Sequence, residues 1–287
     1  MNGFMLMPAI RTVLIRYMQK LSGSLDTFVN KIQNTDLLTK QEKEILVRNS
    51  ELVNKHKGDR CFIIANGPSL GSQDLSLLKT EITFTVNGFW KHPVVKEWQP
   101  TYHSVIDKAF FTDEEKIKEF WKNITSNIPS STFFIPLLRG YEANRKHLFT
   151  PFDQTYYIAT SGPPSPKIDL TKLMQGFQSC SAIALALAIY MGCNPIYLIG
   201  FDHDYLAYRG IDHHFYSGPI VRDHKHGVVP LTELSSYESE MKSMLKLWSN
   251  YKSLSIAAAK KNIQIFNATE GGYLDLFERR SYSSLFE

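Results

Sequence analysis

The chain has 287 residues, of which 43% are hydrophobic and 21% are charged, an ordinary composition for a folded globular protein. Lysine and arginine exceed aspartate and glutamate only by 32 to 28, so charge gives no indication of a nucleic-acid partner. The longest apolar runs, such as 182–191, fall well short of the ~20 residues that a membrane-spanning helix needs. Three cysteines (Cys61, Cys180 and Cys193) lie in apolar stretches without CxxC spacing, which predicts buried, reduced thiols in a cytosolic protein.

Residues 1–57 are expected to form an N-terminal helical extension, and residues 58–287 a single catalytic domain. Apolar residues recur at three- and four-residue steps from Ile10 to Ile32, which predicts an amphipathic helix over about 8–33. Up to Leu25 its only charged side chains are basic. Three interpretations stay open: contact with an anionic membrane surface, a homo-oligomer formed through a coiled coil, or packing on its own domain.

A second helix is predicted over about 37–55, because Thr39 and Glu42 have the spacing of a capping box. Gly58 marks its end. We therefore expect a cytoplasmic protein. The basic amphipathic helix leaves open an alternative, peripheral attachment at the inner face of the cytoplasmic membrane.

From residue 60 onward, short apolar runs alternate with helical segments. The runs typical of buried strands are 61–65, 82–86, 102–106, 132–135, 196–199 and 263–266. Helical spacing is seen over about 113–127, 181–191 and 232–261. This alternation predicts a Rossmann-like α/β domain with a mainly parallel sheet flanked by helices.

Small or polar residues follow five of the predicted strands. They are Asn66-Gly67-Pro68-Ser69, Asn87-Gly88, Asp107, Gly200-Phe201-Asp202 and the NATEGG run at 267–272. Each could be an ordinary turn, because asparagine, aspartate and glycine favour turns. Ligands of parallel sheets, however, bind beyond the carboxyl ends of the strands, so five such ends predict a shared ligand cleft.

The strongest local motif is IIANGPSL, in which a buried strand enters a glycine turn. Pro68 suits a helix start, and Ser69 can offer its hydroxyl to a phosphate or to a helix end. The motif is neither the GxGxxG dinucleotide fingerprint nor a GxxxxGK[ST] phosphate loop, which disfavours NAD and P-loop ATP chemistry.

The segment 200–226 holds five of the nine histidines, with aspartates and tyrosines between them. Histidine is the natural general base near neutral pH. Alternatively, Asp202, His203 and Asp204 could bind a divalent metal, or His224 and His226 a transition metal. A solvated polar loop is the third interpretation.

Together these pieces resemble the MptE-like superfamily, which includes archaeal 6-hydroxymethylpterin diphosphokinases and flagellin-modifying motility accessory factors. The chain is also similar in plan to bacterial sialyltransferases that use CMP-sialic acid. The resemblance covers roughly 58–275, and its most specific parts are GCNPIYLIGFD and NATEGG.

This resemblance implies a nucleotide site and assigns roles to particular residues. The nucleotide contacts are Asn66, Gly67, Pro68, Ser69, Asn87, Asp107 and Asp202, with Ser179 or Ser181 near phosphate or sugar at a helix N-terminus. Substrate contacts are Tyr205, Tyr208, Asn267 and Glu270; the sialyltransferase-like pattern has a tyrosine where this chain has Asp204. Such families place a functional histidine after the GFD strand, which favours His214 as catalytic base, with His226 second.

The function expected is a glycosyltransferase of bacterial surface-glycan or glycoprotein assembly. Its partners would be a nucleotide-sugar donor, with a CMP-linked sugar favoured, and a glycan or protein acceptor. One alternative is pyrophosphoryl transfer from ATP to a pterin alcohol, in which Mg²⁺ would be held by Asp202 and Asp204. The other is a non-catalytic scaffold that binds a partner through the helix at 8–33.

Overall fold

The computed structural model describes residues 38–111, 113–148, 154–160, 165–209, 214–217 and 235–287. The predicted helix at 8–33 and three of the candidate histidines (His213, His224 and His226) lie outside these residues, so their predictions stay untested.

The described residues form one parallel β-sheet with the strand order β5-β4-β3-β2-β1-β6-β7-β8. Every neighbouring pair is parallel. The strands are β1 (Cys61–Ile64), β2 (Ile82–Val86), β3 (Tyr102–Ser104), β4 (Thr132–Pro136), β5 (Thr155–Ile158), β6 (Ile196–Ile199), β7 (Ile265–Asn267) and β8 (Glu278–Arg279). The predicted Rossmann-like α/β fold is confirmed.

The helices are α2 (Lys40–Val47), α3 (Glu114–Asn127), α4 (Leu137–Arg145), α5 (Cys180–Met191) and α6 (Tyr237–Ala259). The sequence did not predict α4, β5 or β8, and it placed the last predicted strand two residues too early. Ile263 still donates its backbone N–H to Ala258 at the end of α6, so the chain turns there and β7 begins at Ile265. The predicted 232–261 helix begins only at Tyr237, where Ser236 caps it.

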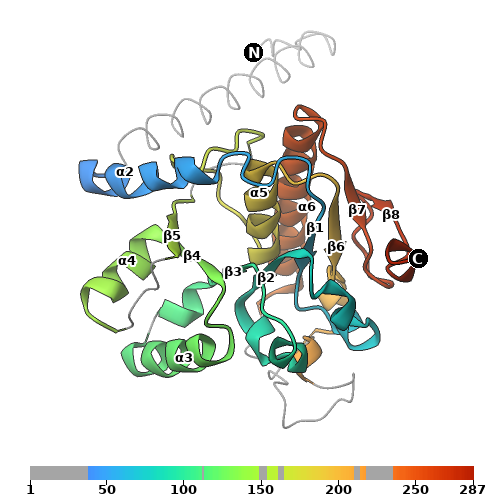
Figure 1. The fold of residues 1–287 in the computed structure, drawn as a ribbon, viewed down its shortest axis with the longest axis horizontal. Coiled ribbons are helices and arrows are strands. Elements are labelled where there is room, and N and C mark those ends of the chain that lie inside the picture. Colours follow the sequence, from blue (N-terminus) through green and yellow to red (C-terminus); the bar gives the residue numbers. More distant parts are fainter. Residues whose placement is uncertain (1–37, 112, 149–153, 161–164, 210–213, 218–234) are drawn as a thin grey trace, which may run out of the picture.

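Both faces of the sheet are covered, as the wholly apolar strands predicted. Cys61 and Ile63 of β1 face the core formed with α5 and α6, whereas Phe62 and Ile64 face the opposite core. Helix α5 is apolar all round, with every residue from Ser181 to Met191 buried, because it lies between the sheet and α6 (Figure 1).

Residues 38–57 pack on the α/β domain. The capping box of Thr39 and Glu42 is present, but α2 ends at Val47 and a 3-10 turn continues to Leu52. Asn49 in this turn is 1% exposed and donates to the carbonyls of Tyr157 and Leu170 at 2.8 and 2.7 Å. The domain boundary predicted at residue 57 stays a prediction.

The strand order fixes where a ligand site is expected. From β1 the chain builds the sheet in one direction through β2 to β5, and it then returns to the other side of β1 with β6. Loops that leave β1 and β6 therefore diverge at their carboxyl ends, which creates a crevice at this topological switch point.

Candidate nucleotide site at the switch point

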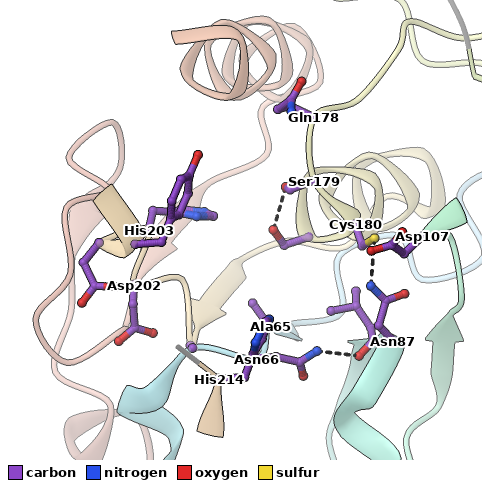
Figure 2. A pocket seen from close by; sticks show the side chains of 16 residues that line it. Ala65, Asn66, Asn87, Asp107, Gln178, Ser179, Cys180, Asp202, His203 and His214 are labelled. Carbon is purple, nitrogen blue, oxygen red and sulfur yellow. Dashed lines mark hydrogen bonds between the residues drawn. The ribbon is translucent and has the colours of Figure 1, made fainter. Parts of the chain in front are cut away.

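A cavity of about 410 Å³ lies at the carboxyl ends of β1, β2, β3 and β6 and at the N-terminus of α5 (Figure 2). Its lining residues are Ala65, Asn66, Gly67, Val86, Asn87, Asp107, Gln178, Ser179, Cys180, Ser181, Gly200, Asp202, His203, Asp204, Tyr205 and His214. Four of the five strand ends predicted to share a cleft therefore contribute to this cavity, whereas no residue of the NATEGG run after β7 lines it.

Many of the sequence-predicted site residues lie in this wall, and several do not. Those in the wall are Asn66, Gly67, Asn87, Asp107, Ser179, Ser181, Asp202, Asp204, Tyr205 and His214. Those outside the lining are Pro68, Ser69, Tyr208, Asn267 and Glu270. Gln178 and Cys180 line the cavity although no site role was predicted for them. His203, one of the five histidines of 200–226 and a predicted alternative metal ligand, lines it too.

Asp202 joins the loop after β6 to the loop after β1. Its carboxylate accepts the backbone N–H of Ser69 at 3.1 Å and the Ser69 hydroxyl at 2.8 Å. Gly67 is needed here, because a Cβ on this residue would lie 1.7 Å from Asp202 Oδ2. Burial raises the pKa of Asp202, and the two hydrogen bonds from Ser69 oppose this shift. Ser69 thus directs its hydroxyl to Asp202.

Asn66 borders the cavity with an unsatisfied acceptor. Its side chain is 8% exposed, and its Nδ2 donates to the carbonyl of Val86 at 3.1 Å. Within the described residues, its Oδ1 is buried and has no hydrogen-bond partner. Leaving a buried acceptor unpaired costs about 1–3 kcal/mol, so such atoms usually mark a missing water or ligand.

Asn87 connects three elements at the cavity wall. Its Nδ2 donates to Cys180 Sγ at 3.1 Å, and its Oδ1 accepts the N–H of Ile106 at 3.3 Å. The residue has a left-handed backbone with φ of 43°, and its carbonyl accepts a hydrogen bond from His103 Nε2 at 3.2 Å. Burial raises the pKa of the Cys180 thiol to about 12, so this group stays a neutral thiol.

The N-terminus of α5 opens into the cavity. Ser179 caps the helix, and its hydroxyl oxygen accepts the N–H of Ala182 at 3.1 Å. The hydroxyl of Ser181 lies 2.9 Å from that of Ser179 and 3.1 Å from the Tyr251 hydroxyl. A helix N-terminus carries a partial positive charge, and Ser179 satisfies only one of the first N–H groups of α5, so the others can favour an anion.

His203 is held in the wall by aromatic side chains. Its Nε2 lies 2.7 Å from the Tyr251 hydroxyl, and its ring contacts Phe201 and Trp248 edge to face. Desolvation lowers the pKa of His203 to about 4, so the imidazole is neutral at physiological pH. A left-handed backbone with φ of 49° aims this ring toward α6.

His214 is exposed and lies on the rim of the cavity. Its ring stacks on that of Tyr216 with 4.9 Å between centroids, and Lys91 Nζ lies 4.6 Å from the Tyr216 ring centre. Phe215 donates its backbone N–H to the carbonyl of Asn66 at 3.0 Å, which fixes this short segment beside the loop after β1.

The NATEGG run makes structural contacts. Asn267 is 1% exposed; its Nδ2 donates to the carbonyl of Leu274, and its Oδ1 accepts the N–H of Thr269. Glu270 is exposed and accepts a hydrogen bond from Ser72 at 2.8 Å. Neither side chain lines the cavity.

Charge in the described wall is acidic. Asp107, Asp202 and Asp204 lie there, and no lysine or arginine is among the described lining residues. In the described part of the chain, no cluster of three or more histidine, cysteine, aspartate or glutamate side chains has a geometry that could hold a metal ion. Both oxygens of Asp202 are already engaged by Ser69, so binding Mg²⁺ would require them to be shared.

The fold and the cavity define a Rossmann-like protein with a candidate ligand site at its topological switch point. The family model described as 6-hydroxymethylpterin diphosphokinase MptE-like matches residues 36–207, and the chain belongs to this MptE-like family. The family resemblance seen in the motifs is thus confirmed. No curated protein matches the sequence.

Solved structures of sialyltransferases are similar to this chain at low identity. Sialyltransferase CstII from Campylobacter jejuni in complex with cytidine-5′-monophosphate is 16% identical with a TM-score of 0.41, covering 78% of this chain and 85% of that chain. Its complex with CMP-3FNeuAc is 15% identical with a TM-score of 0.43, covering 77% and 85%. A mammalian sialyltransferase in complex with Gal-beta-1-3GalNAc-ortho-nitrophenol is 11% identical with a TM-score of 0.35, covering 82% and 87%. At this level of similarity we draw no function from them.

Two further expectations concern thiols and membranes. All three cysteines are free, with Cys61 and Cys193 buried, as predicted, and Cys180 only partly so. Among the described residues, no helix combines the length and the apolar composition that crossing a bilayer requires.

Proposed function

We propose that this protein is a transferase that moves a sugar from a nucleotide-activated donor to a hydroxyl acceptor. The observation that carries the proposal is the cavity at the switch point, which is lined by both the N-terminus of α5 and the exposed imidazole of His214. The helix N-terminus suits a phosphate, and the imidazole can accept a proton; such a transfer needs both.

The donor phosphate is placed at the N-terminus of α5. Ser179 takes only the N–H of Ala182, and a helix leaves its other first N–H groups without intrahelical partners. With no lysine or arginine in the described wall, these N–H groups and the serine hydroxyls supply neutral donors. Neutral donors suit the single negative charge of a CMP-sugar phosphodiester.

The nucleoside is placed against the ends of β1 and β2. Asn66 and Asn87 both line this part of the cavity, and Oδ1 of Asn66 has no hydrogen-bond partner among the described residues. The preference for CMP comes from the motif resemblance to sialyltransferases. Ser69 supports this loop through its hydrogen bond to Asp202.

His214 is assigned the role of general base. The acceptor oxygen forms a bond to the anomeric carbon while the bond from that carbon to the phosphate oxygen breaks. The acceptor proton passes to the imidazole of His214, and the nucleoside monophosphate leaves. Tyr205, which lines the cavity, is assigned to the acceptor. Tyr208 and Glu270, which do not line it, stay predicted acceptor contacts.

We propose that the acceptor is a glycan or a protein and that the transfer belongs to bacterial surface-glycan or glycoprotein assembly. The basic helix predicted at 8–33 would serve to hold the enzyme at the inner face of the cytoplasmic membrane or to pair two copies. His226 remains the second candidate for the base.

A second candidate function is pyrophosphoryl transfer from ATP to a pterin alcohol, which the description of the matching family favours. The same helix N-terminus would bind the phosphates, and Asp202 and Asp204 would hold Mg²⁺. The engagement of Asp202 by Ser69 counts against this use of its carboxylate.

Ligand binding distinguishes these functions. Thermal unfolding and calorimetry would be measured with CMP, UDP, GDP, and ATP with Mg²⁺, because a ligand of the folded state raises the melting temperature. We expect CMP to bind and His214→Ala to abolish transfer while keeping CMP affinity; the exposed His147→Ala is the matched control. Magnesium-dependent AMP release with a pterin acceptor would support the second function, and failure of every nucleotide to bind would refute both.

A further inference from the structure

Four polar side chains form a continuous hydrogen-bonded chain from the loop after β6 to the cap of α5. His203 Nε2 lies 2.7 Å from the Tyr251 hydroxyl, and this hydroxyl lies 3.1 Å from Ser181 Oγ. Ser181 Oγ lies 2.9 Å from Ser179 Oγ, which accepts the N–H of Ala182. Three of these residues (His203, Ser181 and Ser179) line the cavity, where Figure 2 labels His203 and Ser179.

When Tyr251 and Ser181 both donate within the chain, its hydrogen bonds can run in only two directions. Tyr251 is fully buried, and burial raises its pKa, so it remains a phenol with one hydrogen. Each serine hydroxyl also has one hydrogen. If His203 Nε2 accepts from Tyr251, every other bond must run toward His203. If it donates, Tyr251 keeps its hydrogen and Ser181 lies within reach to accept it, so a chain in which both Tyr251 and Ser181 donate runs toward Ser179.

The two directions leave different groups facing the cavity. If His203 Nε2–H donates to Tyr251, then Tyr251 donates to Ser181, Ser181 donates to Ser179, and the Ser179 hydrogen remains for a ligand. If His203 Nε2 accepts instead, Ser179 must donate to Ser181, and it presents only a lone pair. An anionic phosphate oxygen needs the first direction, because it accepts hydrogen bonds.

We propose that His203 and Tyr251 are positioning residues that direct the Ser179 hydroxyl toward the donor phosphate, with His203 in the Nε2–H form. This inference rests on the nucleotide-dependent transfer proposed above. In this role His203 binds no metal and does not touch the reacting atoms; it acts on the ligand through Tyr251 and the two serines.

The surroundings of His203 hold it in this role. The left-handed backbone of His203 is uncommon for a residue with a side chain and is costly, so it needs support from its neighbours. The carbonyl of Asp202 accepts the N–H of Tyr273 at 2.7 Å, which fixes the peptide just before His203. Phe201 and Trp248 contact the ring, so that Nε2 can reach Tyr251.

This hydrogen-bonded chain, which we call the relay, makes a specific prediction for nucleotide binding. Tyr251→Phe removes one hydroxyl from the chain while keeping the ring that packs in the core. We expect CMP affinity to fall about 10-fold, the effect of one hydrogen bond to a charged group, and cytidine affinity to stay unchanged because cytidine lacks the phosphate. Tyr282→Phe is the control, since it removes a buried tyrosine hydroxyl that donates to the carbonyl of Asp74 away from the cavity.

Two substitutions of His203 separate hydrogen bonding from packing. His203→Gln keeps an N–H donor that can reach Tyr251, and we expect CMP affinity within about 3-fold of that of the unchanged protein. His203→Met fills similar space without a donor, and it is expected to match Tyr251→Phe in its loss of CMP affinity. Equal losses for CMP and cytidine in either variant would overturn the relay, because they would show a purely structural role.

The tautomer can also be measured directly, without any variant. In the CMP complex, ¹⁵N spectra of the histidine rings should show His203 protonated at Nε2 and unprotonated at Nδ1. An Nδ1–H tautomer in that complex would overturn the inference while leaving the proposed function intact. If the unchanged protein binds no nucleotide, the proposed function and the inference fail together.

Discussion

His103 is expected to lower the free energy of unfolding of this protein in acid. The residue lies on β3 and is 0% exposed. Its Nε2–H donates to the carbonyl of Asn87 at 3.2 Å, so its Nδ1 accepts the Thr85 hydroxyl at 2.7 Å. Desolvation lowers the pKa of His103 to about 3, against 6.5 for an exposed histidine.

The sign and size of the effect follow from these two pKa values. Above pH 6.5 His103 is neutral in both the folded and the unfolded chain and contributes no pH dependence. Between pH 6.5 and about 3 the unfolded chain binds one more proton at this site, so the free energy of unfolding falls by about 1.4 kcal/mol per pH unit as pH decreases. From pH 7.5 to pH 5 the loss is therefore about 2 kcal/mol.

The measurement compares urea unfolding of the unchanged protein and of His103→Gln at pH 7.5, 6 and 5. At pH 7.5 the variant is expected to be less stable, because it disturbs the bonds to Thr85 and Asn87. Its deficit should shrink by about 2 kcal/mol by pH 5, since glutamine takes up no proton. His147→Gln, at an exposed position, should keep the pH profile of the unchanged protein. Parallel profiles for His103→Gln and the unchanged protein would refute the reasoning.

Three further substitutions test the loops around the cavity. Gly67→Ala places a Cβ 1.7 Å from Asp202 Oδ2, so we expect a loss of about 1–3 kcal/mol in unfolding free energy and loss of nucleotide binding; an unchanged melting temperature would contradict this. Ser69→Ala removes the hydroxyl that donates to Asp202 at 2.8 Å, and it should cost about 1.5–3 kcal/mol at pH 7, with a smaller cost in acid once the carboxylate is protonated; a cost independent of pH would argue against the contact. Gly88→Ala brings a Cβ to 2.7 Å from Tyr216 Cε1, so the ring under His214 must move; transfer should slow while CMP affinity stays, and equal effects on both would contradict this role.

The fold was predictable where buried elements have a recognisable pattern of apolar residues. Strand β6 is covered on both faces, so its sequence is a continuous apolar run, and its predicted bounds match the structure. The predicted bounds of β2 match as well, although Thr83 and Thr85 alternate with its apolar residues. Helix α4 has no such pattern, because its nine residues place only Leu137, Gly140 and Ala143 in the interior. Strand β8 has only two residues, and both are exposed charged side chains.

The position of the site was predictable for a topological reason. Parallel strands end at one edge of the sheet, so polar residues that directly follow β1, β2, β3 and β6 must come near one another. Which of these side chains face a ligand was not predictable, because Ser69 and Asp202 satisfy each other and Asn66 keeps an unpaired oxygen. Residue type gives the number of hydrogen bonds that a side chain can make, whereas only the folded structure gives the number that its neighbours already use.

The same reasoning explains why His203 did not stand out among the five histidines of 200–226. Its role depends on Tyr251, which is 48 residues away and belongs to the helical spacing of α6. In the sequence, this tyrosine counts as one more apolar residue of a buried stripe. A buried tyrosine still needs a partner for its hydroxyl, and here the available partners are Ser181 and His203 in the cavity wall. Burying the polar tip of an aromatic core residue thus connects the packing of α6 to the ligand site proposed at the N-terminus of α5.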